Sequence, residues 1–450
     1  MREPWELSIV EAGERLRSGG LSAAALLKSV LSRIDALEPR VLAWARLASD
    51  GLAQAERADA LLRSGRYLGP LHGIPVGLKD IYYTAGLETS AGSKVMEGFV
   101  PMFDATAVRR LREAGAIVVG KTATTPFAFS DPAPTRNPWN LEHTPGGSSS
   151  GSAAGLACGM CLGALGTQTG GSIVRPSAFC GIVGLKPTYG RISRHGLIPL
   201  AWSLDHPGPM ARTVSDVAAL LQVLAGPDPE DATAATEPVP QYADALKIPV
   251  AGLRAGIPDR YFPERWSPDV GAALQAAAHV LERLGVRLRD VKLPDCFEAG
   301  VATNRVIMHA EGATYHRERF ATQWREYPPK LAALIEAGLL IPAAAYLRAQ
   351  QVRSVAMAAM GRLFGEIDLL LAPSAPGPAP QSLGSTGDSV FNTPASTFGL
   401  PALGLPMGFS PTGLPLGLQL IGRPFDECTV LRAGAAYEAA TPWHEQRPTI

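Results

Sequence analysis

The chain has 450 residues, of which 46% are hydrophobic and 18% are charged, a composition that excludes a disordered chain and allows a large buried core. Its 41 basic and 41 acidic side chains cancel, so no broad electrostatic field favours nucleic acid or an anionic membrane surface. We therefore expect a small neutral or apolar partner and no nucleic acid.

The N-terminal stretch, MREPWELSIVEAGERLRSGG, carries acidic residues where a secretion signal needs an unbroken apolar run, which favours a cytoplasmic protein. The five cysteines are odd in number and scattered, which favours a reducing compartment over a disulfide framework. Cys158 and Cys161 form a C-x-x-C motif inside an apolar run of small residues, so we interpret them as core cysteines. The most apolar window, residues 331–347, is interrupted by a glutamate and a proline, so no membrane span is expected.

Hydrophobic periodicity predicts the fold class in chain order. Between residues 7 and 63, apolar residues recur at helical spacing and predict a helical opening. From residue 72 onward, short β-branched runs alternate with helical stretches, and helical patterns then fill residues 266–287 and 298–366. This alternation is typical of an α/β fold with a largely buried sheet, and no composition shift marks a clear domain boundary.

Residues 115–122, GAIVVGKT, match the phosphate-loop pattern G-x-x-x-x-G-K-[ST]. A phosphate loop needs a strand first, then an open turn, then a helix that begins at the lysine. Here the four residues between the glycines are themselves the predicted strand, and Pro126 disfavours a helix after Lys121. We therefore do not interpret this motif as a nucleotide site.

Two clusters rich in glycine and serine, at residues 144–155 and 166–172, flank a predicted small-residue helix. Both adjoin apolar segments, where flexible linker would be costly to bury, so we interpret the glycines as permitting tight turns and close backbone approach. An acyl-transfer site needs a nucleophilic hydroxyl, a base, and N–H donors aimed at the developing oxyanion. The second cluster can supply the hydroxyl of Ser172 and an oxyanion hole from four N–H groups, those of Thr169, Gly170, Gly171 and Ser172.

The base is less evident from the residues alone. None of the eight histidines is recognisably paired with an acid, and no G-x-S-x-G elbow surrounds Ser172. Lys79 lies in the apolar run IPVGLKDI, where a lysine is expensive to bury unless it is paired or neutral. Either Lys79 forms a structural ion pair, with Asp80 or another acid, or it stays neutral and acts as a general base.

Lys79, the GGSSSGSAA run and the TGGS run together resemble the amidase signature family, whose members hydrolyse amides, and often esters or carbamates, with a Ser-cisSer-Lys triad. The resemblance includes residues 70–81, 179–218 and 398–427 and follows the family's order from about residue 5 to 440. It implies a single domain, 1–450, with a central mixed, mostly buried sheet covered by helices on both faces. A helical N-terminal segment, 1–65, is expected to pack on this α/β core.

By position, the resemblance makes Ser172 the nucleophile, Ser148 the bridging serine and Lys79 the terminal base, with a cis peptide bond between Gly147 and Ser148. It implies an acyl-enzyme on Ser172. The sequence contains no metal-ligand cluster and no cofactor-binding motif, so we expect neither a metal nor a cofactor. The chain departs from the family form D-T-G-G-S-I-R-x-P, because Gln168 and Val174 replace the Asp and the Arg, and an arginine follows one place later at Arg175. We expect Gln168 and Arg175 to replace an Asp–Arg support beneath the nucleophile.

The substrate is expected to contact residues 124–140 and the apolar helices near 298–347, where the family shapes its pockets. These segments suit a neutral or apolar amide, ester or carbamate, including a urethane, unless their side chains belong to the core. The candidate side chains are Phe127, Phe129, Trp139, Leu340, Ile341 and Tyr346, and Gln168 is added as a candidate substrate-binding residue. We expect a stand-alone amidase, monomeric or homodimeric. The alternatives are a glutamine-hydrolysing subunit of an amidotransferase complex and a non-catalytic scaffold with a relic site.

Overall fold

Eleven strands form one sheet in the computed structural model, which describes residues 2–450. Their order across the sheet is β1-β3-β2-β4-β6-β5-β10-β11-β9-β7-β8. β2 pairs in parallel with β3 and β4, and β7 pairs in parallel with β8 and β9, whereas the other neighbours are antiparallel. The strands are β1 (Trp44–Leu47), β2 (Pro75–Lys79), β3 (Ile117–Thr122), β4 (Gly163–Gln168), β5 (Val183–Lys186), β6 (His206–Ala211), β7 (Arg254–Pro258), β8 (Arg287–Val291), β9 (Leu369–Pro373), β10 (Ala402–Phe409) and β11 (Pro415–Gly422). The sheet is therefore mixed.

Several strands that are not at an edge of the sheet are buried along their whole length. β2, β3 and β4 have no exposed position, which is typical of strands covered on both faces. Residues Ile117–Thr122 of the GAIVVGKT motif form β3, so Lys121 lies inside a strand and not at the start of a helix. The edge strands β1 and β8 instead expose several residues.

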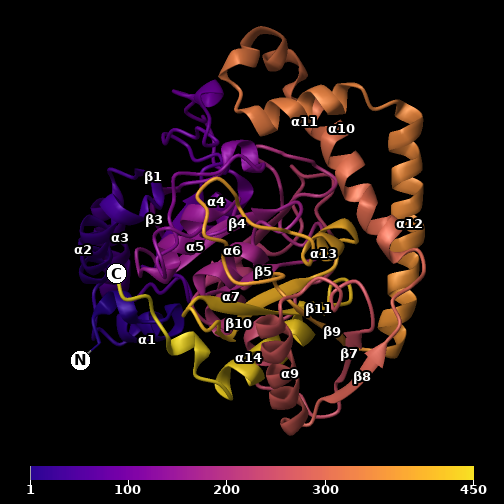
Figure 1. Cartoon of the computed structure of the whole chain (residues 1–450). Helices are drawn as coiled ribbons and strands as arrows, with labels where there is room; N and C mark the ends of the chain where they lie inside the picture. The colour runs from indigo at the N-terminus through magenta and orange to yellow at the C-terminus, as the bar shows by residue number, and fades with distance from the viewer. Residues whose placement is uncertain (1) are drawn as a thin grey trace.

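Helices cover both faces of the sheet (Figure 1). A Cβ atom added to Gly417 of β11 would meet Ala178 of α6, whereas one added to Gly422 of the same strand would meet Val430 of α14. Because side chains alternate between faces along a strand, and these glycines are an odd number of residues apart, α6 and α14 lie on opposite faces. The helices are α1 (Ile9–Arg17), α2 (Ala23–Val41), α3 (Gly51–Arg63), α4 (Thr106–Glu113), α5 (Ser150–Ala157), α6 (Val174–Cys180), α7 (Val214–Leu224), α8 (Tyr242–Ala245), α9 (Pro268–Arg283), α10 (Phe297–Gln323), α11 (Pro329–Leu339), α12 (Ala343–Glu366), α13 (Thr393–Thr397) and α14 (Glu427–Ala439). The predicted α/β fold is confirmed.

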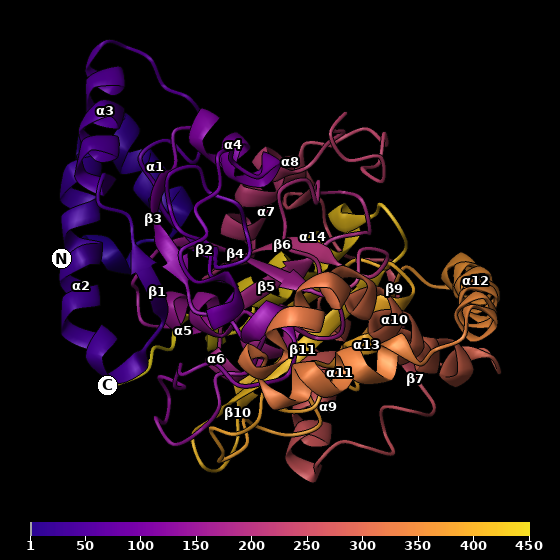
Figure 2. The ribbon, with the colours of Figure 1, turned by 90° about the horizontal axis from the view of Figure 1, so that it is seen from above.

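The N-terminal helices α1, α2 and α3 gather at the β1 end of the sheet (Figure 2). The first turns of α1 and α2 are capped by serines: Ser8 accepts a hydrogen bond from the Glu11 amide, and Ser22 accepts one from the Ala25 amide. Arg33 of α2 donates to the carbonyl of Cys158, just after α5. This last contact attaches the helical N-terminal segment to the core.

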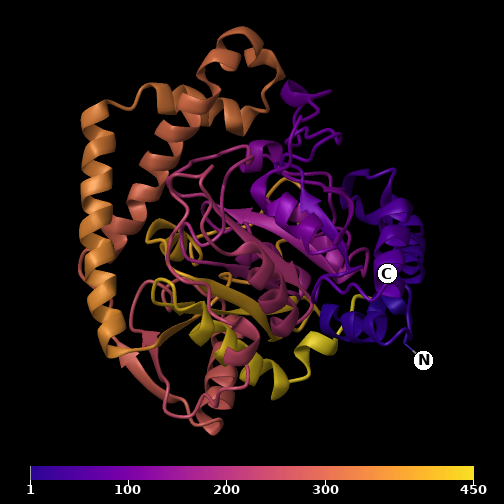
Figure 3. The same ribbon diagram turned by 180° about the vertical axis from the view of Figure 1, so that it is seen from behind.

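At the other end, α10 packs against α11 and α12, which form an arm along the outside of the molecule (Figure 3). Leu340, at the junction of α11 and α12, is 82% exposed. In the part of the chain that the structure describes, no single helix has the length and apolar composition of a membrane span. Only α11 and α12 taken together pass that test, and the chain bends by 100° between them.

The sheet topology brings two glycine-rich loops together. β2 ends at Lys79 and its parallel neighbour β4 ends at Gln168. Because parallel neighbours end at the same edge of a sheet, the segment that follows β4 starts beside Lys79. The loop before α5, which carries Ser148, and the loop between β4 and α6, which carries Ser172, both meet at this edge.

Candidate active site

Lys79 is fully buried at the end of β2 and is held by two hydroxyl groups. Its ammonium donates to Ser148 Oγ at 2.6 Å and to Thr167 Oγ1 at 2.7 Å. Burial lowers the pKa of Lys79 from 10.5 to about 7, and the negative charge of Asp205 opposes this shift. Lys79 is therefore present in both its neutral and its charged form near pH 7.

Asp80, the acid next to Lys79 in the sequence, pairs with a different lysine. Its carboxylate lies 3.2 Å from the ammonium of Lys121 on β3, and both side chains are fully buried. Lys121 also donates to the carbonyl of Tyr82 and to the hydroxyl of Thr89, at 2.6 Å each. Lys121 thus forms a structural ion pair, while Lys79 lies within 4 Å of no carboxylate in residues 2–450.

Ser148 lies in a tightly packed loop, after a cis peptide bond from Gly147. Its hydroxyl accepts from Lys79, and its carbonyl accepts from Thr124 Oγ1 at 3.0 Å and from the Thr125 amide at 3.3 Å. Side chains of Thr386 and Thr125 would lie within 3.1 Å of a Cβ atom at Gly147, so only glycine fits there without movement. The bridging position proposed from the sequence is thus held by contacts on both sides.

Ser172 lies in the loop that leads from β4 to α6 and lines a cavity. Its hydroxyl has no hydrogen-bond partner among residues 2–450, Ser148 included. Within the same residues, the backbone N–H groups of Thr169, Gly170, Gly171 and Ser172 donate to no protein acceptor. Free N–H donors around a hydroxyl are the arrangement that an oxyanion hole requires.

The loop around Ser172 is held by hydrogen bonds to Gln168, whose side chain is fully buried. Gln168 Oε1 accepts the amides of Ile173 and Val174, both at 2.9 Å, and so holds the first turn of α6. Its Nε2 donates at 3.0 Å to Ser396 Oγ, which donates in turn to the carbonyl of Gly170 at 2.7 Å. Gln168 therefore supports the loop through buried hydrogen bonds and does not line the cavity, contrary to its expected contact with substrate.

Thr169 connects the same loop to a buried acid. Its hydroxyl donates to Asp205 at 2.5 Å, and its carbonyl accepts from the Asn304 side chain at 3.2 Å. Burial raises the pKa of Asp205 to about 6, and the hydrogen bond from Thr169 and those from the amides of Leu200 and Ala201 oppose this shift. The loop that supplies the candidate oxyanion hole is thus fixed by contacts from distant parts of the chain.

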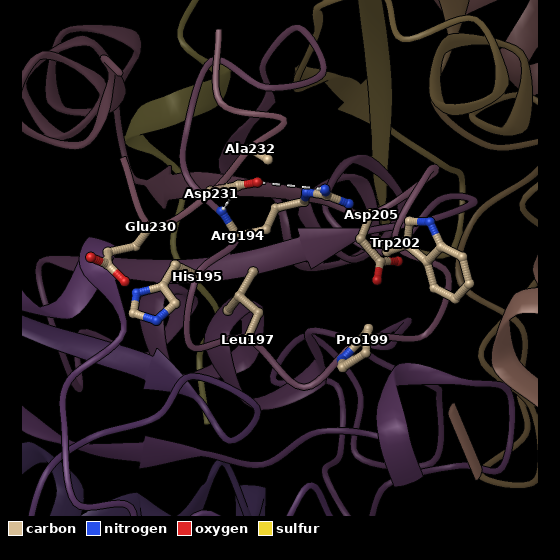
Figure 4. A pocket seen from close by; sticks show the side chains of 9 residues that line it. All are labelled: Arg194, His195, Leu197, Pro199, Trp202, Asp205, Glu230, Asp231 and Ala232. Carbon is tan, nitrogen blue, oxygen red and sulfur yellow. Dashed lines mark hydrogen bonds and ion pairs between the residues drawn. The ribbon is translucent and has the colours of Figure 1, made fainter. Parts of the chain in front are cut away.

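Asp205 also borders a second cavity, of about 240 Å³ (Figure 4). In this view the ion pair between Arg194 and Asp231 lies on one side, and Asp205 and Trp202 lie near each other. Leu200 lines the first cavity, and its amide donates to Asp205, so this carboxylate connects residues that line the two cavities.

The cavity beside Ser172 has a volume of about 210 Å³ and a mixed lining. Phe129, Leu200 and Met308 are its large apolar side chains, and Arg175 and Asp388 are its charged ones. Phe127 is instead packed in the core, with its ring centroid 4.4 Å from that of His316. The other candidates named from the sequence that do not line this cavity are Trp139, Leu340, Ile341 and Tyr346.

The sequence analysis missed three side chains that hydrogen-bond the loop before Ser172, those of Asp205, Asn304 and Ser396. Asp205 lies within the SLDHPGPM run of the resemblance, so a search for acids in that region would have found it. Asn304 and Ser396 come from α10 and α13, far away in the sequence and without a motif. Among the described residues, no group of three or more His, Cys, Asp or Glu side chains could hold a metal ion.

Comparisons with known proteins find relatives that match nearly the whole length of this chain. The Amidase family model matches residues 25–431. A glutamyl-tRNA(Gln) amidotransferase subunit of Myxococcus xanthus is 43% identical, over 96% of this chain and 97% of its own length. Native peptide amidase from Stenotrophomonas maltophilia is 33% identical with a TM-score of 0.85, and the match covers 98% of each chain. A further structure has a TM-score of 0.93 at 32% identity, covers 99% of this chain and 100% of its own, and comes from a vestigial protein complex linked to an s-triazine catabolic enzyme.

These relatives contradict the expected partners. The sequence analysis expects a neutral small-molecule partner, no nucleic acid, and a monomer or homodimer. Relatives that match this chain over nearly its full length are named as subunits of an amidotransferase of glutamyl-tRNA(Gln), so the expectations of no nucleic acid and of a monomer or homodimer are wrong. The reason is physical: a formal charge of zero is a sum over the whole surface and does not exclude local contacts with RNA or with another protein chain.

Proposed function

This chain belongs to the amidase signature family, and on that premise we propose that it hydrolyses the C–N bond of a carboxamide through an acyl-enzyme on Ser172. The observation that carries this proposal is the contact of Lys79 with Ser148 beside a loop whose N–H groups are free around Ser172. A nucleophile, a relay, a base and an oxyanion hole are the parts that acyl transfer requires.

The reaction begins with Lys79 in its neutral form. Lys79 accepts the Ser148 proton while Ser148 accepts the Ser172 proton, and Ser172 Oγ attacks the carbonyl carbon. The oxyanion is bound by the N–H groups of residues 169–172. When the tetrahedral intermediate collapses, the C–N bond breaks, and the proton returns from Lys79 through Ser148 to the leaving nitrogen.

Water then attacks the acyl ester and gives its proton to the same relay. The second intermediate collapses with protonation of Ser172 Oγ, so the carboxylic acid departs and the free enzyme is restored. Catalytic hydrogen bonds often tighten only when substrate is bound, so we expect Ser148 and Ser172 to come into contact in the substrate complex.

For the substrate we propose the side-chain carboxamide of glutamine, hydrolysed to supply ammonia in an amidotransferase assembly. The support is the 43% identity to an amidotransferase subunit that matches along almost its entire length. The carboxylate of Asp388 on the cavity wall also suits the ammonium group of a free amino acid. A role with tRNA would place the protein in the cytoplasm.

Another linear carboxamide is the second candidate. Its support is the likeness to peptide amidase and the apolar part of the cavity formed by Phe129, Leu200 and Met308. Such a wall suits an alkyl or aryl group better than a free amino acid.

One experiment tests the chemistry and separates the two substrates. Purified chain is mixed with glutamine, with asparagine or with a peptide C-terminal amide, and the released ammonia is measured. We expect ammonia from glutamine, no release by Ser172→Ala, and fluorophosphonate labelling on the peptide that contains Ser172. Release from the peptide amide alone would favour the second candidate, whereas a chain that neither labels nor hydrolyses would be a non-catalytic scaffold. Ser150→Ala is the control and should keep ammonia release, because the Ser150 hydroxyl, at the start of α5, donates to the Gly146 carbonyl and to no member of the triad.

A further inference from the structure

Arg175 lies one turn after Ser172, and its guanidinium bridges two loops that lie on either side of the site. It donates to the carbonyl of Gly147 at 2.6 Å, and to the carbonyl of Gly387 at 2.9 Å. It also donates to Thr386 Oγ1 at 3.2 Å. Because Gly147 precedes Ser148, the first of these bonds holds the peptide group that carries the bridging serine.

Ser148 is held at three places, each by a different part of the chain. Lys79 of β2 binds its hydroxyl, and Thr124 and Thr125, after β3, bind its carbonyl. The third place is the carbonyl of Gly147, and its bond from Arg175 connects Ser148 to α6 and hence to the segment that carries Ser172. This guanidinium is therefore a direct link between the two serines.

We infer that Arg175 is a positioning residue, which sets Ser148 relative to Ser172 through the Gly147 carbonyl. The inference rests on the proposed function and adds a residue to it. It also revises the idea that Gln168 and Arg175 form one support beneath the nucleophile. Gln168 binds the amides of α6, whereas Arg175 binds the loop of Ser148, so the two act on different serines.

The chemistry of the side chain fits this role. Arg175 is only 6% exposed, and within residues 2–450 no carboxylate lies within 4 Å of it. Burial lowers the pKa of Arg175 to about 10, and Asp388 opposes the shift, so the group stays charged at neutral pH. A planar guanidinium can reach two carbonyls in fixed directions at once, which a lysine ammonium on a flexible stem does not do.

The test compares Arg175→Met and Arg175→Lys with Arg212→Met. Arg212 is a matched control: it is also 6% exposed and donates to two carbonyls, those of His444 and Gln446. It follows β6 at the end where Ala211 pairs with Gly163, whereas the candidate site lies at the Gln168 end. Initial rates of ammonia release, thermal midpoints and the rate of fluorophosphonate labelling at Ser172 are measured for each variant.

We expect Arg175→Met to lower kcat ~10–100-fold with little change in KM, because a misplaced relay slows the chemical step more than binding. Labelling should slow in the same proportion, and Arg175→Lys should recover part of both rates. Arg212→Met should keep the wild-type kcat, although its loss of thermal stability should be comparable to that of Arg175→Met.

A loss confined to KM would instead make Arg175 a substrate-binding residue, and equal losses of kcat in Arg175→Met and Arg212→Met would reduce it to a structural one; either result overturns the inference. If Arg175→Met does not fold, Arg175→Lys becomes the test. Wild-type rates of ammonia release and labelling in Arg175→Lys would then overturn the inference. Wild-type chain that is not labelled at Ser172 would overturn the proposed function itself, whereas equal labelling of wild type and Arg175→Met would overturn only the inference.

Discussion

The ammonium of Lys79 donates to Ser148 Oγ at 2.6 Å from the end of a strand that is buried at every position. No carboxylate of residues 2–450 pairs with this lysine, so burial determines its protonation. The pH dependence of the reaction is therefore a direct test of Lys79 as the base.

We expect kcat to rise with pH and to reach half its plateau near pH 7. The pKa of Lys79 is lowered to about 7, so the lysine is charged and unable to accept a proton below that pH and neutral above it. The measurement is kcat between about pH 5.5 and 9 at saturating substrate. Lys79→Arg should be inactive throughout, because a guanidinium does not lose its proton in this range. An acid limb that persists with the same midpoint in an active Lys79→Met chain would assign the titration to another group.

Asp80→Asn should destabilise the fold by about 3–5 kcal/mol, because it leaves the buried ammonium of Lys121 without its anionic partner. Burial lowers the pKa of Lys121 to about 8, and in the wild type the negative charge of Asp80 opposes this shift. Urea unfolding at neutral pH measures the loss. The double variant Asp80→Asn with Lys121→Met is the control and should recover much of the stability. A single variant as stable as wild type would show that the pair contributes little.

Gln168→Leu should lower both stability and kcat. It removes the acceptor for the amides of Ile173 and Val174, and each buried N–H group left without a partner costs about 1–3 kcal/mol. Gln168→Glu keeps these acceptors, but it loses the donor to Ser396 and buries a carboxylate, so its stability should also fall below that of wild type. Thermal unfolding and initial rates are measured side by side. Equal stability of Gln168→Leu and wild type would contradict this account of the loop.

Thr169→Val should lower kcat about 10-fold while the chain stays folded. It removes the hydrogen bond to Asp205, and hydrogen bonds to charged groups contribute about 1.5–3 kcal/mol. Thr169→Ser keeps the hydroxyl and is the control, with a rate close to wild type. Because the pKa of Asp205 is raised to about 6, the carboxylate loses its charge below that pH, and the difference between Thr169→Val and wild type should narrow there. A ratio of the two rates that stays constant across this titration would be incompatible with the assignment.

The sequence by itself determined the features that short stretches encode. The alternation of buried runs with helical periodicity indicated an α/β fold, because burial on both faces leaves a local hydrophobic pattern. Lys79 inside an apolar strand and serines behind paired glycines were visible for the same reason, since their surroundings in the chain are also their surroundings in space. The GAIVVGKT motif could likewise be set aside, because the order of strand and turn is a local property.

Tertiary structure alone decided which side chains meet. Asp80 is adjacent to Lys79 in the chain, yet it follows the last residue of β2 and pairs with Lys121 from the neighbouring strand β3. Gln168 and Arg175 lie on one short segment but bind the backbone of different loops, because a strand end and a helix point their side chains in different directions. Asn304, Ser396 and Asp205 reach the site only through the packing of α10, α13 and a distant loop. Contacts between residues far apart in the sequence depend on how the elements pack, and no local pattern records that packing.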